Sequence, residues 1–141
     1  MKFFYRCIIV LFITTFNFNN LKAADIYYEK GKDLFNDKKY DEAKFNFEKN
    51  IVFNPKNELS YLYLAKIFKI EKKFDLEANN LDTVILLNPR NEDAIYGLAL
   101  ISIKKSNFEK AKELIETLET VCEKLCSSKK ELKDKLNNAS K

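Results

Sequence analysis

Two stretches of the sequence that begin in the same way decide the fold. "FNPKNELSYLYLAKIF" covers residues 53–68, and "LNPRNEDAIYGLALIS" covers residues 87–102. In both, Asn-Pro, a basic residue and a second Asn lead into an apolar run, so the interval from Pro55 to Pro89 is a candidate period. Proline disfavours helix at the residue before it and suits the first turn of a new helix. The motif therefore predicts a joint between helices that returns at a fixed period.

The interval from Pro55 to Pro89, applied to the rest of the chain, brings four further sets of positions into register. Within each set the side chains are of one kind: small, aromatic, acidic or apolar. The sets are Gly31, Ala65 and Ala99; Tyr40, Phe74 and Phe108; Asp41, Asp75 and Glu109; and Phe47, Leu81 and Ile115. Agreement at one period predicts a repeat in which each unit is one supersecondary element.

Each unit is expected to contain two helices, because apolar residues recur at three- and four-residue steps. The break between them falls at "NDKKYD", "IEKKFD" and "KKSNFE", where the acidic residue suits the positive N-terminal end of the second helix. The small residue at 31, 65 and 99 lets the paired helices approach closely. The aromatic residue at 40, 74 and 108 fills the corner between them.

This pattern resembles the tetratricopeptide repeat (TPR) family, whose motif is visible in the first unit as Gly31, Tyr40, Ala43, Phe47 and Pro55. The resemblance implies an all-α fold, an α-solenoid of three stacked helix-turn-helix hairpins with a C-terminal capping helix. We predict repeats over residues 24–57, 58–91 and 92–125, followed by the capping helix over residues 126–141.

Two features depart from the family pattern. Glu77 stands where the other repeats have Ala43 and Ala111, so we expect locally adjusted packing in the second repeat. The third repeat has Cys122 and Glu123 where Asn and Pro would close it, and it is expected to end differently.

The N-terminal segment, residues 1–23, has the layout of a secretory signal peptide. "MKFFYR" carries two positive charges, "CIIVLFITTF" is an apolar stretch of ten, and "NFNNLKAA" ends in small residues, which predicts cleavage after Ala23. The alternative is an uncleaved anchor, which would be the protein's one contact with a membrane. A spanning helix needs about 20 apolar residues, so we favour a cleaved signal. The protein is then exported, and periplasmic if its source is bacterial.

Composition argues against several functions. Without Lys2, Arg6 and Lys22, the 25 basic residues fall to 22 against 21 acidic ones, which gives no general case for nucleic-acid binding. The chain has no His, the side chain most often used for acid–base catalysis and for metal binding. It also has no Gly-rich loop and no nucleophile–base pair, so we expect neither an enzyme nor a cofactor.

Cleavage would remove Cys7 and leave Cys122 and Cys126 as an even pair in an oxidising setting. One is expected at a helix end and the other in the following turn, where a disulfide would add about 2 kcal/mol of stability. Free thiols, a half metal site and a redox pair stay open as alternatives. Zinc needs about four ligands, and the spacing is not the Cys-x-x-Cys of thioredoxin-like enzymes, so we favour the disulfide.

After the cysteines, Ser128 followed by Glu131 matches a capping box. It predicts a short polar helix with Leu132 and Leu136 on one side. Such a helix would cover the last hydrophobic layer, as the ends of solenoids require. The cysteine pair followed by this helix also resembles small exported bacterial proteins of the TPR family.

The family resemblance places a binding groove on the first helices of the repeats. Aromatic, aliphatic and cationic side chains are mixed there, with Asp93 near one end, which suits an extended or helical peptide with apolar anchors and some acidic residues. The family's carboxylate-clamp residues are not reproduced, since only Lys32 has a suitable charge. The predicted groove residues are Tyr28, Lys32, Phe35, Leu62, Lys66, Lys69, Tyr96, Leu100 and Lys104.

The leading hypothesis is therefore an exported, non-enzymatic scaffold or adaptor that holds a protein or peptide partner in this groove. One alternative is a homo-oligomer, a self-associating module of an envelope assembly. Another is a thiol redox protein that uses Cys122 and Cys126, for which an accessible thiolate of lowered pKa would be needed.

Overall fold

The computed structural model describes residues 25–140. The predicted signal segment over residues 1–23 lies outside this range. The described chain forms two compact units, residues 25–60 and residues 61–140, with the division inside one helix, and each is described by itself. None of the helices within residues 25–140 is long and apolar enough to cross a membrane.

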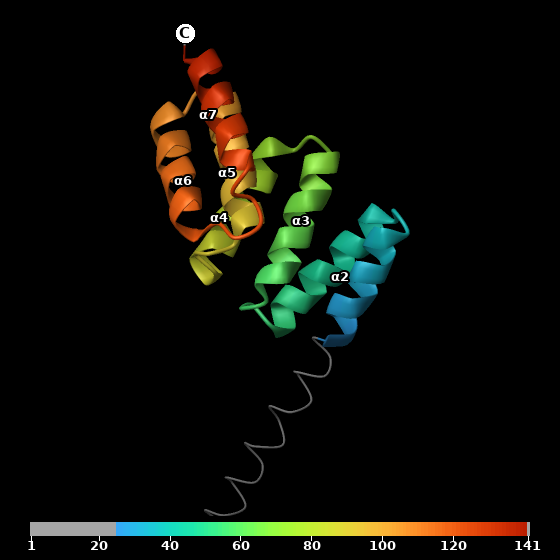
Figure 1. Ribbon diagram of the computed structural model, residues 1–141. Helices are drawn as coiled ribbons and strands as arrows, with labels where there is room; N and C mark the ends of the chain where they lie inside the picture. Colours follow the sequence, from blue (N-terminus) through green and yellow to red (C-terminus); the bar gives the residue numbers. More distant parts are fainter. Residues whose placement is uncertain (1–24, 141) are drawn as a thin grey trace, which may run out of the picture. The chain divides into compact units, whose positions relative to one another are not determined.

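The described residues form helices joined by turns, and no strand occurs among them (Figure 1). This confirms the all-α prediction for that part of the chain. The predicted breaks and joints fall in the turns, and the acidic residues at 41, 75 and 109 lie in the first turns of their helices. After a helix described over residues 25–36, the elements are α2 (Tyr40–Phe53), α3 (Glu58–Ile70), α4 (Phe74–Leu87), α5 (Glu92–Lys104), α6 (Phe108–Val121) and α7 (Ser128–Ala139).

The period of the repeat is visible in the backbone as well as in the side chains. One residue in each break adopts a positive φ, which is uncommon for residues other than glycine and typical of a helix C-terminus. The amide of the following residue then donates to a carbonyl in the last turn of the preceding helix, at 2.8–2.9 Å. The positive-φ residues are Lys38 (62°), Lys72 (58°) and Ser106 (58°).

Within residues 25–60, the close approach predicted at Gly31 is confirmed. A Cβ atom on Gly31 would lie 2.9 Å from the Phe47 ring, too close for any side chain without a shift. Phe47 and Ala43 on α2 are fully buried. Nearby, the buried Ser60 hydroxyl donates to the Asn50 side-chain oxygen at 2.7 Å, so that both polar groups are satisfied.

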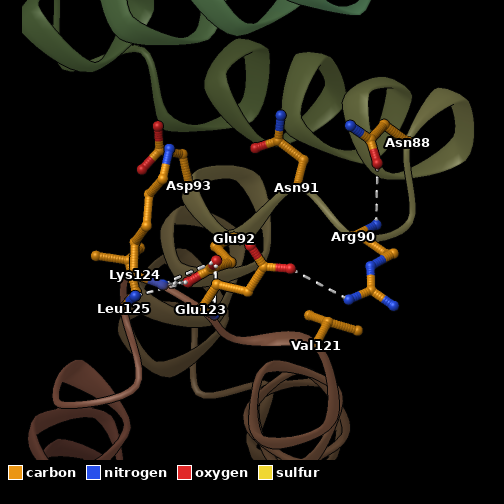
Figure 2. Close-up of a pocket in the computed structure, with 9 residues that line it drawn as sticks. All are labelled: Asn88, Arg90, Asn91, Glu92, Asp93, Val121, Glu123, Lys124 and Leu125. Carbon is orange, nitrogen blue, oxygen red and sulfur yellow. Dashed lines mark hydrogen bonds and ion pairs between the residues drawn. The ribbon is translucent and has the colours of Figure 1, made fainter.

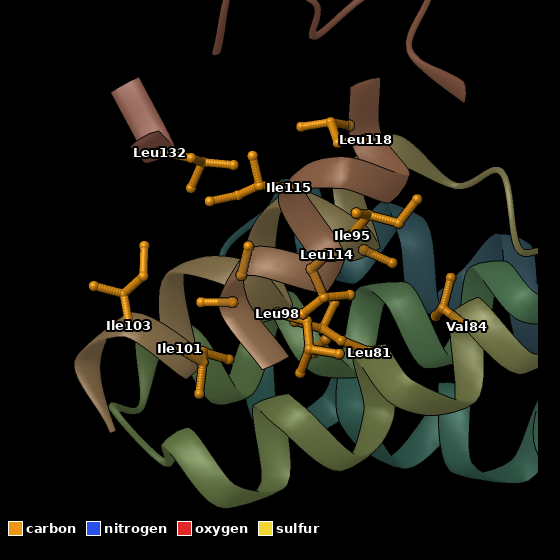
Figure 3. Packing of buried hydrophobic residues seen from close by; sticks show 14 of the residues in the cluster. Leu81, Val84, Ile95, Leu98, Ile101, Ile103, Leu114, Ile115, Leu118 and Leu132 are labelled. Atoms are coloured by element: carbon orange, nitrogen blue, oxygen red, sulfur yellow. The ribbon is translucent and has the colours of Figure 1, made fainter. Parts of the chain in front are cut away.

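Within residues 61–140, side chains of α3, α4, α5, α6 and α7 contribute to one hydrophobic core (Figure 3). Ile95 and Leu98 from α5 lie among Val84 of α4 and Ile115 and Leu118 of α6, all buried. The predicted apolar positions Leu81 and Ile115 and the small residues Ala65 and Ala99 are part of this cluster.

The predicted capping helix is present as α7, which packs against α5 and α6. Leu132 is fully buried and Leu136 is partly buried against the same core. The capping-box prediction is wrong, because Ser128 is already the first helical residue and Ser127 before it makes no side-chain cap. Ser127 has helical backbone angles (φ −71°, ψ −29°), whereas a capping residue normally adopts extended ones.

Candidate functional site: a cleft between α3 and α5

A cleft of about 300 Å³ opens within residues 61–140. We call it the α3–α5 cleft, because these two helices supply most of its walls. Its surface mixes apolar side chains with two lysines and two carboxylates. The lining residues are Leu62, Ala65, Lys66 and Lys69 of α3, Glu77 and Leu81 of α4, Asp93, Tyr96 and Gly97 of α5, and Leu125.

Four of the predicted groove residues line this cleft, namely Leu62, Lys66, Lys69 and Tyr96. Two others do not line it. Leu100 packs against the hydrophobic core, and the Lys104 ammonium lies 3.3 Å above the centre of the Phe74 ring.

The three groove residues predicted from the first repeat lie in the unit of residues 25–60. Tyr28 and Phe47 have ring centres 6.2 Å apart, and Phe35 meets Tyr40 edge to face at 5.5 Å. The Lys32 ammonium lies 5.6 Å from the centre of the Tyr28 ring. These contacts give all three residues a local packing role, and their part in binding stays a prediction.

Charge is unevenly distributed in and around the α3–α5 cleft. The side chains of Lys66 and Lys69 are exposed, whereas Glu77 keeps only 4% of its surface accessible. Burial raises the pKa of Glu77, although Lys69 and Lys104 act in the opposite direction by favouring its charged form. A largely buried carboxyl group therefore lines the cleft together with two exposed lysines.

Tyr96 connects the cleft to the capping helix. Its hydroxyl donates to the Glu131 carboxylate of α7 at 3.3 Å. Burial and the neighbouring Glu131 raise the pKa of Tyr96, which keeps the hydroxyl protonated as a donor. Tyr96 thus lines the cleft and also connects α5 to α7 by a hydrogen bond. The sequence analysis predicted only its place in the groove.

A second cavity, of about 370 Å³, lies beside the turn that follows α6 and is called the loop cavity (Figure 2). Its main feature is the carboxylate of Glu92, the first residue of α5. One oxygen accepts from the amide of Glu123 at 2.8 Å, and the other accepts from Leu125 at 2.6 Å. The amide of Lys124 contacts both oxygens, at 3.1 and 3.0 Å. Three consecutive backbone amides thus converge on one carboxylate, in the manner of an anion-binding nest.

The amides held by Glu92 belong to the loop closed by Cys122 and Cys126, which are joined by a disulfide with Cα atoms 5.2 Å apart. As predicted, Cys122 follows the last residue of α6 and Cys126 lies in the turn before α7. Because Leu125 also lines the α3–α5 cleft, this loop forms part of the cleft wall. In the loop cavity, Glu92 is engaged with the loop and Arg90 with Glu123, so we take the α3–α5 cleft as the candidate binding site.

We expect the hold of Glu92 on the loop to depend on pH. The hydrogen bonds from Leu125, Glu123 and Lys124 lower the pKa of Glu92 below its ordinary value of 4.5, Leu125 contributing most. A lowered pKa stabilises the fold above the ordinary value, and this contribution is lost as pH falls through the folded-state pKa. Hydrogen-exchange protection of the three amides should therefore be constant from neutral pH to about 4.5 and then fall.

Glu92→Gln should remove the charged acceptor and lower the protection of these amides at neutral pH. Glu123→Gln is the matched control, because it makes the same change on the same loop at an exposed carboxylate that pairs with Arg90 at 3.5 Å. Equal protection factors in Glu92→Gln and in the unchanged protein would contradict this role.

Paired helices at a fixed period, with a terminal cap, define an α-helical repeat domain. Solved structures with the same fold are TPR domains, so the chain has the TPR fold. The TPR domain of OM64 from Arabidopsis superimposes with a TM-score of 0.73 at 18% identity, covering 84% of this chain and 98% of that one. The first TPR of Spaghetti (RPAP3), bound to the HSP90 peptide SRMEEVD, gives 0.74 at 22% identity, covering 85% and 95%.

The type III secretion chaperone SycD of Yersinia enterocolitica, in complex with a peptide of the translocator YopD, gives a TM-score of 0.68 at 13% identity, covering 82% of this chain and 91% of that one. Comparisons with family models and with curated protein sequences find no match. Among residues 25–140 there is no group of three or more Cys, Asp or Glu side chains placed to hold a metal ion.

Proposed function

We propose that this protein is a non-enzymatic adaptor that binds a peptide segment of a partner protein in the α3–α5 cleft. The observation that carries the proposal is the cleft itself. It combines apolar lining residues with exposed lysines, and its volume of about 300 Å³ suits one or two anchoring side chains.

The charges of the cleft favour a segment that contains acidic residues. Lys66 and Lys69 stand one turn apart on α3 and can meet one or two carboxylates of a ligand. The apolar surface of Leu62, Leu81 and Leu125 can take an aliphatic or aromatic side chain. A structural neighbour, the Spaghetti TPR, is bound to a peptide that is rich in acidic residues, SRMEEVD, which supports this class of ligand.

An exported location is part of the proposal. It is supported by the signal-like pattern of residues 1–23 and by the disulfide between Cys122 and Cys126, since disulfides persist in oxidising compartments. In a bacterial cell the partner would then be a periplasmic or envelope protein.

Reversing the charges of Lys66 and Lys69 should strongly reduce capture of the partner. We expect Lys66→Glu/Lys69→Glu to weaken binding about tenfold or more, because both positions then repel the acidic segment. The measurement is a pull-down from the envelope fraction, read by mass spectrometry and followed by titration of the captured protein.

Lys112→Glu/Lys130→Glu is the matched control, because it makes the same change in net charge at exposed positions on α6 and α7. If a protein is captured by Lys112→Glu/Lys130→Glu but not by Lys66→Glu/Lys69→Glu, the result supports binding in the α3–α5 cleft. Equal capture by both variants would place binding elsewhere, and capture of the chain by itself alone would favour self-association.

A further inference from the structure

Glu77 occupies a position that in the other two repeats holds only a methyl group. Ala43 and Ala111 lie one period before and one period after it, and both are fully buried. Glu77 is also buried, with 4% of its surface accessible. A charged group at such a position costs stability unless it is paired or hydrogen-bonded, so its presence here requires an explanation.

The carboxylate of Glu77 has no partner among residues 25–140. It neither accepts a hydrogen bond nor forms an ion pair there, and the influence of Lys69 and Lys104 on it acts only at longer range. Glu77 lines the α3–α5 cleft, so its remaining accessible surface is reached from that space. The cleft therefore contains a largely buried carboxylate that no hydrogen bond or ion pair within residues 25–140 engages.

We propose that Glu77 is a specificity-determining residue of the cleft, and that it accepts a hydrogen bond from a neutral donor, an amide or a hydroxyl group, on a bound acidic peptide. This inference rests on the proposed function, because it assumes that a peptide occupies the cleft.

The charges around Glu77 favour an uncharged hydrogen-bond donor on the ligand over a basic side chain. Three lysines, Lys66, Lys69 and Lys104, line the cleft or lie near Glu77. They outnumber the two carboxylates of the cleft, Glu77 and Asp93. A basic side chain of the ligand would be repelled by the lysines, whereas Asn, Gln, Ser, Thr or a backbone amide would not. Lys66 and Lys69 stay available to an acidic residue of the same peptide.

The same geometry rejects a peptide that is apolar at this position. When a peptide covers the cleft it excludes water from Glu77, and an apolar side chain would leave the carboxylate desolvated and unpaired. Replacing the donor by a side chain of equal size without it should therefore weaken binding about 10- to 100-fold.

The test begins with a random peptide library displayed on phage, which is selected on the purified protein. The protein should enrich peptides that combine an acidic residue, an apolar residue and a side-chain or backbone donor. A side-chain donor is then replaced in a synthetic peptide by its apolar counterpart, Asn by Leu, Gln by Met or Thr by Val, and a backbone amide by its N-methyl form. Both peptides are titrated against the unchanged protein and against Glu77→Ala and Glu77→Gln.

We expect the loss caused by the apolar replacement to be about 10- to 100-fold in the unchanged protein and under about threefold in Glu77→Ala. Glu77→Ala should fold, because alanine fills the same slot in the other repeats, and Glu77→Gln keeps the volume and should give an intermediate loss. Circular dichroism checks both variants.

The outcomes separate this inference from the proposed function. One outcome is that the apolar replacement weakens binding equally in the unchanged protein and in Glu77→Ala, while Lys66→Glu/Lys69→Glu abolishes binding. That outcome overturns the role of Glu77 and leaves the proposal of peptide binding in the cleft intact. If Lys66→Glu/Lys69→Glu binds the enriched peptides normally, or no peptide is enriched, both proposals fail.

Discussion

Phe47→Ala should lower the free energy of unfolding of the unit formed by residues 25–60 by about 4 kcal/mol, the largest effect that we expect from a single substitution. The Phe47 ring is fully buried, and it lies against Gly31, where there is no Cβ to fill the space that the ring would leave. Truncation therefore removes the transfer free energy of the ring and leaves a cavity that this close helix pair can close only in part. Urea denaturation followed by circular dichroism measures the loss.

Phe45→Ala is the matched control for this prediction. Phe45 lies on the same helix, is 55% exposed, and lies under the Lys49 ammonium at 4.6 Å. Its truncation should cost about 1 kcal/mol or less. Equal losses from the two substitutions would mean that Phe47 is not the central side chain of this helix pair.

Leu132→Ala should cost about 3 kcal/mol and release α7 from the core. Leu132 is the one residue of α7 that is buried, and it packs into the hydrophobic cluster of residues 61–140 (Figure 3). Apart from the half-buried Leu136, the other ties of α7 are polar and exposed, such as the Tyr96–Glu131 hydrogen bond, and they are worth much less. Hydrogen exchange over residues 128–139 should rise more than exchange in α5.

Leu136→Ala removes the same number of atoms from a half-buried position on the same face and should cost less than half as much. A larger loss from Leu136→Ala than from Leu132→Ala would contradict the packing described for the cap.

The periodic parts of the fold could be predicted from sequence because each depends on residue type at a fixed spacing. Gly31 and Phe47 fit together because only glycine leaves room for the ring, and Leu132 and Leu136 share one face of α7 at helical spacing. The disulfide was predictable because Cys122 follows a helix end and Cys126 lies in the turn after it.

Other features could not be predicted, because they depend on contacts between distant residues or on backbone angles that residue type does not indicate. Glu92 resembles any first-turn acid in sequence, and its role is visible only when the later loop with the disulfide is placed against it. The positive φ angles at Lys38, Lys72 and Ser106 occur without a glycine that would indicate them. Glu77 was visible as a departure from the repeat, but its position on the cleft required the fold.

The central claim is that the α3–α5 cleft binds an acidic peptide segment. The most direct measurement is a ¹⁵N–¹H NMR titration of the protein with the best acidic peptide from the library. We predict that the largest chemical-shift changes fall on residues that line the cleft, led by Leu62, Lys66, Tyr96 and Gly97. Changes concentrated on the outer face of α6, with the cleft residues unmoved, would contradict the account.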